Sequence, residues 1–308
     1  MRLNFKFVNL FGTAYKKGNL SFTSNGMGLF SPVGNQITLF DLARDEARTL
    51  KVDASFNICH VAVSPHLSFL IAFDENGNAY MLSLLAGTVI SQFKLRYPAT
   101  AVSFSPNGEF LAIAKGHSIL VFHTPSLKRH YNQMEFYRMY YGASEDVKHL
   151  DWSSDSRFFI AGSDDTIARV YSVKPTRGLV IYSLTGHNGP IKGAYLTEDS
   201  LDAIVISADG HVVLWECDTG LSSISSSLAL NATEIKDKKA LYKLAKRHFY
   251  FTTKNVSIRD EVTVTAYHKK LKILITGFES GLLMIHMMPD FTIIDEVQLN
   301  LRYHSGGK

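Results

Sequence analysis

The sequence predicts an all-β fold, a β-propeller whose blades are antiparallel sheets of four strands. Two recurring elements indicate this fold. One is an apolar-alternating strand that ends in Ser or Thr at a turn, and the other is a tight turn between two short apolar strands. Both recur about once per 40–45 residues, the length of one such blade. Each element occurs six times, so we expect six recognisable blades in the 308 residues.

The first element appears as LSFTSNG, VAVSPH, VSFSPNG, LDWSSDS, AYLTEDS and TAYHKK. Its turn positions are Thr23, Ser64, Ser105, Ser153, Thr197 and His268. The steps between these positions are 41, 41, 48, 44 and 71 residues. Four of the five steps match one blade length, and the longer last step predicts an insertion inside the fifth blade.

The second element recurs in step with the first, once in each unit. Its turns centre on Gly34, Gly77, Gly116, Thr166, Gly210 and Gly281. Glycine suits these places because the favoured hairpin turns require a positive φ. Five or six residues after each turn, the third strand of the blade carries Phe40, Ser83, Phe122, Tyr171, Trp215 or His286.

The stretch Leu184–Asp218 is the most complete blade. Its order of Gly-His, apolar strand, Asp-Gly turn and terminal Trp is typical of the WD-repeat type of blade. Its polar side chains resemble the set that links Trp through Ser and His to Asp in WD-repeat proteins. A buried indole N–H is costly without an acceptor, so we expect such a hydrogen-bond chain here. Its members would be His187, Ser207, Asp209 and Trp215. The same His, Ser and Asp superficially suggest a hydrolase, but their blade positions explain them better as support for Trp215.

Two segments stand outside the six units. We expect residues 5–15 to form an N-terminal strand that completes the last blade. The insertion is expected at about residues 221–250, which are Ser-rich at first and then basic. Leu241, Leu244, Ala245 and Phe249 recur at helical spacing, so a short amphipathic helix is possible. The basic side chains of the insertion have two interpretations. They form a solvated surface loop, or they contact RNA phosphates or an acidic partner. They are Lys236, Lys238, Lys239, Lys243, Lys246 and Arg247.

Composition places the chain among globular proteins, with 46% hydrophobic and 19% charged residues. The net charge of +4 permits contact with nucleic acid, although ordinary solvated surfaces reach the same value. Cys59 and Cys217 lie in different repeat units, which suits a reducing compartment. The sequence has neither a signal-peptide pattern nor a run near the ~18 apolar residues of a membrane span. We therefore expect a soluble intracellular protein with one propeller domain over residues 1–308.

Catalytic patterns are absent from the sequence. It contains no G-x-S-x-G, H-E-x-x-H, phosphate-binding loop or dinucleotide-binding motif. His117, His123 and His130 straddle a hairpin and its exit loop, with no Cys or carboxylate at ligand spacing. We expect no catalytic residue, no cofactor, no metal and no small-molecule substrate, and so not an enzyme.

Longer segments carry a more specific resemblance. They are FKFVNLFGTAYKKGNLSF, LFSPVGNQITLFDL, VSFSPNGEFLAIAKG, DWSSDSRFF, LTGHNGPIKGAY, KRHFY and PDFTIIDEVQL. With these the chain resembles the periodic tryptophan protein two family, WD-repeat subunits of the UTP-B subcomplex of the small-subunit processome. The opening segment and PDFTII are the most specific. The family looks longer, with a seventh blade, a second propeller and a helical C-terminal region. The resemblance therefore implies a truncated chain that covers an incomplete seven-bladed first propeller.

The resemblance implies a function in ribosome biogenesis. The chain would be a non-catalytic scaffold of the 90S pre-ribosome in the nucleolus, acting in pre-rRNA processing and maturation of the small-subunit rRNA. Its partners would be other UTP-B subunits, processome proteins, a small nucleolar RNP and pre-rRNA. The alternative is a generic WD-repeat adaptor, such as a coat subunit or a substrate receptor of a ubiquitin ligase. A third hypothesis is an enzyme with its active site in the central channel, but the sequence shows no convergent carboxylates for it.

Overall fold

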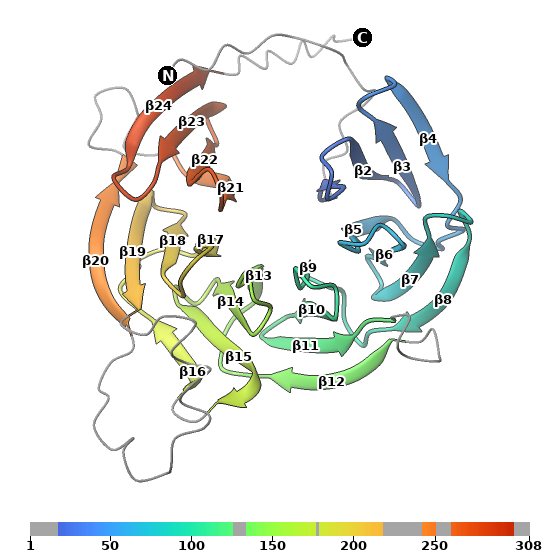
Figure 1. The fold of residues 1–308 in the computed structure, drawn as a ribbon, viewed down its shortest axis with the longest axis horizontal. Helices are drawn as coiled ribbons and strands as arrows, with labels where there is room; N and C mark the ends of the chain where they lie inside the picture. Colours follow the sequence, from blue (N-terminus) through green and yellow to red (C-terminus); the bar gives the residue numbers. More distant parts are fainter. Residues whose placement is uncertain (1–17, 126–133, 177–178, 218–241, 251–259, 299–308) are drawn as a thin grey trace, which may run out of the picture. The chain divides into compact units, whose positions relative to one another are not determined.

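Strands dominate the structure, a computed structural model that describes residues 18–125, 134–176, 179–217, 242–250 and 260–298. The strands of these residues form six antiparallel sheets of four. Each sheet contains four strands that follow one another along the chain, as the labels in Figure 1 show. The predicted six blades of four strands are therefore confirmed.

The chain divides into two compact units, residues 6–157 and residues 158–308 with 1–5. The first unit holds three complete sheets and β13. Their strands are β1 (Ser21–Phe22), β2 (Gly28–Val33), β3 (Gln36–Asp41), β4 (Glu46–Leu50), β5 (Ile58–Val63), β6 (Phe69–Asp74), β7 (Asn78–Ser83), β8 (Val89–Lys94), β9 (Ala101–Phe104), β10 (Phe110–Lys115), β11 (Ser118–His123), β12 (Glu135–Tyr140) and β13 (Val147–Trp152).

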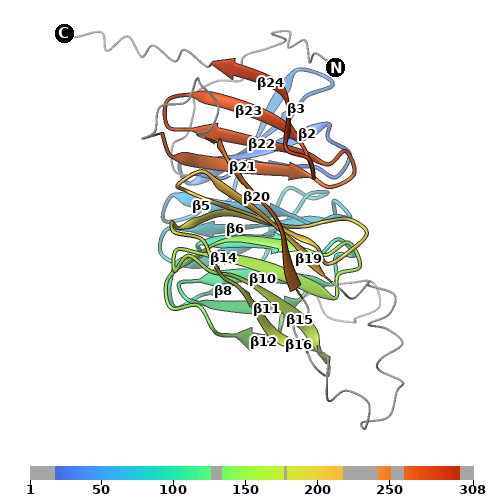
Figure 2. The same cartoon turned by 90° about the vertical axis from the view of Figure 1, so that its left-hand side faces the viewer.

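The second unit holds the other strands of the fourth sheet and all of the fifth and sixth sheets. They are β14 (Phe158–Ser163), β15 (Ala168–Thr176), β16 (Leu179–Leu184), β17 (Ile191–Leu196), β18 (Ala203–Ser207), β19 (His211–Cys217), β20 (Tyr242–Phe249), β21 (Val262–His268), β22 (Ile273–Phe278), β23 (Leu282–Met287) and β24 (Thr292–Gln298). Within this unit the sheet β17–β20 lies beside the sheet β21–β24 (Figure 2).

The turns between first and second strands are held by the side chains that the first repeat element predicts. The Thr23 hydroxyl accepts the Gly28 N–H at 2.8 Å, and the Ser105 hydroxyl accepts the Phe110 N–H at 2.9 Å. In the sixth blade, His268 Nδ1 substitutes for the hydroxyl. The side chain thus satisfies backbone groups that the tight turn leaves without a strand partner.

The turns between second and third strands have the backbone conformation that the second repeat element predicts. The φ angle is positive at Gly34, Gly77, Gly116, Thr166, Gly210 and Gly281. Thr166 adopts 67° without being glycine, a conformation that costs a side-chain-bearing residue some strain. Each of these residues lies in the turn where the second strand of a blade leads into the third. The second sequence element therefore occupies the same place in all six blades, as the first one does.

Apolar side chains fill the space between neighbouring sheets of each unit. In the second unit, one cluster joins β14 and β15 to β17 and β18, and another joins β18 and β19 to β22 and β23. All five residues of β18 are buried, because this strand has apolar contacts on both faces. Sheets that bury both faces against neighbours are what a repeat of this kind needs for stability.

The structure corrects the expectation of a helix near the end of the insertion. Residues 242–249 form β20, the fourth strand of the fifth sheet. The apolar residues only mimic helical spacing, because a register shift between Leu214 and Trp215 interrupts the two-residue alternation of β20. Residues 5–15 and most of the insertion lie outside the described residues, so their predicted roles stay predictions.

Among the described residues no helix is long and apolar enough to cross a membrane. Cys59 and Cys217 are both free thiols. The assignment of the whole chain to one domain stays a prediction.

Candidate functional site

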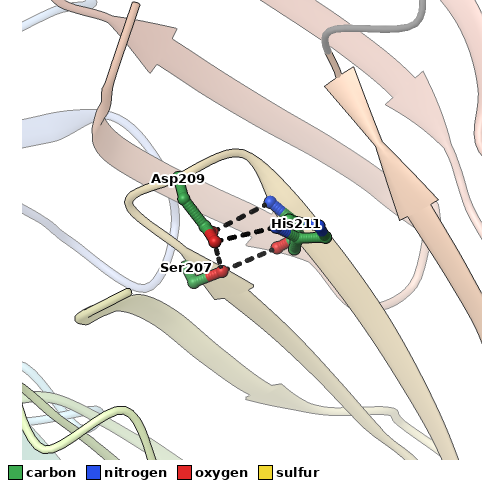
Figure 3. A network of polar contacts seen from close by, with 3 residues as sticks. All are labelled: Ser207, Asp209 and His211. Atoms are coloured by element: carbon green, nitrogen blue, oxygen red, sulfur yellow. Dashed lines mark hydrogen bonds and ion pairs between the residues drawn. The ribbon is translucent and has the colours of Figure 1, made fainter. Parts of the chain in front are cut away.

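The turn between β18 and β19 holds a polar network, drawn in Figure 3. The Ser207 hydroxyl donates to Asp209 Oδ1. His211 makes two contacts with Asp209, from its backbone N–H to Oδ1 at 3.3 Å and from Nδ1 to Oδ2 at 2.8 Å, and its carbonyl oxygen accepts from the Ser207 hydroxyl at 3.4 Å. Burial raises the pKa of Asp209, but the hydrogen bonds from Ser207 and His211 outweigh burial and lower it below its usual value. The carboxylate is therefore the centre of this network.

The predicted chain from Trp215 to Asp209 is not formed. Ser207 and Asp209 are joined, but the buried Trp215 Nε1 and both His187 ring nitrogens have no hydrogen-bond partner among the described residues. Burial lowers the pKa of His187 to about 4, so its ring is neutral at pH 7. His211 takes the place in the network that the sequence assigned to His187.

Strand register explains why Trp215 is excluded from the network. Trp215 pairs with Ala203 on β18, whereas Ser207 lies at the other end of that strand. Four residues of strand separate the two positions by roughly 13 Å. The residues of β18 nearest to Trp215 are apolar, so this strand offers the indole no side-chain acceptor.

The geometry does not fit a hydrolase. A catalytic serine must donate its proton to a histidine, which a carboxylate then orients. Here the Ser207 hydroxyl contacts Asp209 Oδ1 and the backbone carbonyl of His211, and not a ring nitrogen of His211 (Figure 3).

Three other turns between second and third strands also rely on a carboxylate. Asp74 accepts two backbone N–H groups of its own turn, at 3.0 and 2.8 Å. Asp165 forms a buried ion pair with Arg169 at 2.8 Å. Asp260 accepts the Ser280 N–H at 2.9 Å. Because the feature recurs from blade to blade, the network in the fifth blade supports the fold and does not mark a reaction centre.

The predicted basic surface is partly described. Lys243, Lys246 and Arg247 are exposed on β20, and Lys236, Lys238 and Lys239 lie outside the described residues. Lys246 Nζ lies 3.1 Å from Asp290 Oδ1. The Arg247 guanidinium lies against the backbone of Gly186, where an added Cβ would be 3.0 Å from Nη2. Cations of one strand thus reach both the fourth-to-fifth-blade loop and the hairpin of the sixth blade.

The sixth blade also contains a stack of rings that no sequence pattern predicts. Phe291, in the turn between β23 and β24, stacks on His286 with ring centroids 4.2 Å apart and on His248 of β20 with centroids 4.7 Å apart. Tyr250 contacts the Phe291 and His286 rings edge-on. The only trace in the sequence is that His286 stands where four other blades have an aromatic ring.

Metal-binding geometry is not found in the part of the chain that the structure describes. No group of three or more His, Cys, Asp or Glu side chains converges there.

Comparison with known proteins supports the blade assignment. The protein family described as WD domain, G-beta repeat matches residues 134–172. The matched segment starts just before β12, the last strand of the third sheet, and ends within β15 of the fourth sheet. The sequence repeat is thus offset from the structural blade by one strand.

Curated relatives match nearly the whole chain. Periodic tryptophan protein 2 homolog of Mus musculus is 32% identical, and the alignment covers 97% of this chain. The homolog of Schizosaccharomyces pombe is 33% identical, again over 97% of this chain. The chain belongs to the periodic tryptophan protein 2 family, as the resemblance implied. Periodic tryptophan protein 2 of Saccharomyces cerevisiae is 30% identical. The chain spans about a third of the length of these relatives, with 36%, 34% and 32% of them covered.

Solved structures confirm the fold class. The β-propeller domain of Cps50 (Swd1) of Myceliophteria thermophila aligns with a TM-score of 0.70 over 95% of this chain and 88% of its own, at 14% identity. A chain of the Mitotic Checkpoint Complex aligns with a TM-score of 0.68, also at 14% identity. At such identities the likeness extends to the fold alone. The fold is a WD-repeat β-propeller.

Proposed function

We propose that this chain is a non-catalytic scaffold in ribosome biogenesis, a component of the small-subunit processome that acts in pre-rRNA processing. The observation that carries the proposal is the similarity to periodic tryptophan protein 2 relatives over 97% of the chain. The fold adds support, since a propeller of this type offers surfaces for binding partners. The polar network of the fifth blade is consistent with a non-catalytic role, because its hydrogen bonds hold a turn.

The partners that follow from this proposal are other UTP-B subunits, processome proteins, a small nucleolar RNP and pre-rRNA. The location that follows is the nucleolus. A generic adaptor role, in a vesicle coat or a ubiquitin ligase, is the alternative. The repeat pattern supports both roles equally, whereas the similarity to these particular relatives along 97% of this chain favours the first.

Affinity purification separates the two roles. The chain would be tagged at its own locus and purified at moderate salt, with an unrelated tagged WD-repeat propeller as control. We expect small-subunit assembly proteins, box C/D small nucleolar RNA and unprocessed pre-rRNA with this chain but not with the control. Recovery of coat or ligase subunits without pre-rRNA would reject the scaffold role.

A further inference from the structure

The sequence contains four Asn-Gly pairs, and the structure sets one of them apart. They are Asn25-Gly26, Asn76-Gly77, Asn107-Gly108 and Asn188-Gly189. Asparagine is one of the chemically labile residues of proteins. Its side-chain amide is lost when the backbone nitrogen of the next residue attacks it, and glycine leaves that attack unhindered because it has no side chain. Each pair is therefore a candidate for deamidation, and the local structure decides which one reacts.

Three of the pairs lie in tight turns that engage the glycine nitrogen. The N–H groups of Gly26, Gly77 and Gly108 donate to the carbonyl three residues earlier, at 2.9, 3.1 and 2.8 Å. All three glycines have a positive φ, of 70°, 80° and 69°. Two of the side chains are held as well, since the amide oxygens of Asn25 and Asn107 each accept two hydrogen bonds. These turns must open before the glycine nitrogen can attack.

Asn188 and Gly189 lie in the loop between β16 and β17, and they are not held in this way. Among the residues that the structure describes, neither forms a hydrogen bond, and the φ of Gly189 is not positive. Asn188 is exposed, so water and a base can reach its amide. Gly189 is buried, but its nitrogen needs no approach from outside because its target is in the preceding residue. Of the four pairs, only this one can react without first breaking a hydrogen bond that the structure describes.

We propose that Asn188 is a site of spontaneous deamidation. The Gly189 nitrogen forms a bond to Asn188 Cγ and gives its proton to a solvent base. The Cγ–Nδ2 bond breaks, and Nδ2 takes up a proton and leaves as ammonia. Water then opens the resulting succinimide ring. Attack of water at Cγ gives aspartate, whereas attack at the main-chain carbonyl gives isoaspartate, in which the chain continues through the side chain. Water is the only co-reactant, and nothing is oxidised or reduced.

The isoaspartate product disturbs the polar network of the fifth blade. Gly189 packs against Asp209, since a Cβ added to Gly189 would be 3.5 Å from Asp209 Cγ. The next residue, Pro190, accepts the Ala208 N–H at 2.8 Å. Isoaspartate adds one methylene to the main chain just before these contacts and so shifts them, whereas aspartate adds only a charge. Deamidation at Asn188 therefore weakens the link between the fourth and fifth blades as the protein ages.

Peptide mapping by mass spectrometry tests the proposal on the 308-residue chain, incubated in its folded state at mildly alkaline pH. We expect Asn188 to deamidate about two- to tenfold faster than each of the other three asparagines, the factor that corresponds to one net hydrogen bond. An isoaspartyl-specific methyltransferase should label the same peptide. In denaturant the four rates should converge, because the turns are lost. Equal rates in the folded chain, faster reaction at another Asn-Gly pair, or a lead of Asn188 that persists in denaturant would overturn the proposal.

Gly189→Ala provides the matched variant. The added Cβ makes ordinary contacts, the nearest at 3.4 Å to the Asp209 nitrogen, so the variant should fold. Its methyl group hinders the attack, so Asn188 should lose its lead over the other three asparagines. An unchanged rate in folded Gly189→Ala would contradict the mechanism.

Asn188→Asp separates the added charge from the added chain length. This variant should keep the melting temperature of the unmodified protein, whereas the fraction of incubated wild-type chain that carries isoaspartate should melt at a lower temperature. Equal melting temperatures of the isoaspartate fraction and Asn188→Asp would refute the effect on the network.

Discussion

Trp215 pairs with Ala203 on the neighbouring strand, and its buried indole N–H has no hydrogen-bond partner within the described residues. Trp152 provides the contrast, because its Nε1 donates to the Ser103 carbonyl at 3.1 Å. The two tryptophans of the chain therefore differ in how they stabilise it. Trp152 contributes packing and a hydrogen bond, whereas Trp215 contributes packing alone.

Replacing each tryptophan by phenylalanine tests this difference. Trp152→Phe loses its hydrogen bond and leaves a carbonyl without its partner, so it should lower the free energy of unfolding by about 1–3 kcal/mol more than Trp215→Phe does. Urea denaturation of both variants measures it. Equal losses would mean that the Trp215 indole is hydrogen-bonded after all.

Asp209→Asn tests the network of the fifth blade. The amide accepts weaker hydrogen bonds than the carboxylate, so the free energy of unfolding should fall by about 1–2 kcal/mol at pH 7. The pKa of Asp209 is lowered in the folded state, so its contribution is present above the unfolded pKa and is lost as the pH falls through the folded pKa. The exposed Asp199, replaced by Asn, is the matched control and should change stability little. A loss for Asp209→Asn that persisted unchanged at pH 2 would contradict the assignment.

Asp165→Ala tests the buried ion pair of the fourth blade. Asp165 and Arg169 side chains are 5% and 8% exposed, so removing the carboxylate leaves a buried guanidinium without its main partner. We expect a loss of about 3–5 kcal/mol in the free energy of unfolding. The double variant Asp165→Ala with Arg169→Met should be more stable than Asp165→Ala alone. A double variant that is less stable would show that Arg169 acts through other contacts.

Acidification should destabilise the chain through its buried histidines. The folded-state pKa values of His187 and His286 are lowered to about 4, whereas the unfolded chain takes up these protons near pH 6.5. The unfolded state therefore binds more protons between pH 6.5 and 4, and stability falls as the pH falls through that window. Each group contributes a slope of about 1.4 kcal/mol per pH unit. Chemical denaturation at several pH values should show a shallower slope for His286→Phe, and an unchanged slope would place that histidine in solvent.

The sequence was sufficient to predict the blades but not the side-chain network. Turn residues such as Gly210 and Thr197 act locally, so their spacing alone revealed six units. Which histidine contacts the Asp209 carboxylate depends on strand register. The order of residues along the chain does not show whether this is His187 or His211. The outer strand β20 is mostly polar, so it lacks the apolar alternation by which a strand is predicted from sequence. Its register shift spaces the apolar residues as they would be spaced on a helix.

The stack of rings in the sixth blade could not be predicted from the sequence for another reason. His248, His286 and Phe291 come from two sheets and a turn, and Phe291 reaches the histidines from a left-handed backbone conformation with φ of 54°. Only the packing of β20 against the sixth sheet brings them together.

Depletion of the protein, followed by hybridisation analysis of pre-rRNA, tests the central claim most directly. The account predicts that uncleaved small-subunit precursors accumulate and mature small-subunit rRNA falls, while large-subunit rRNA is maintained. Restoration by the wild-type protein would tie the effect to this protein. Normal levels of both rRNAs and their precursors after complete depletion would contradict the account.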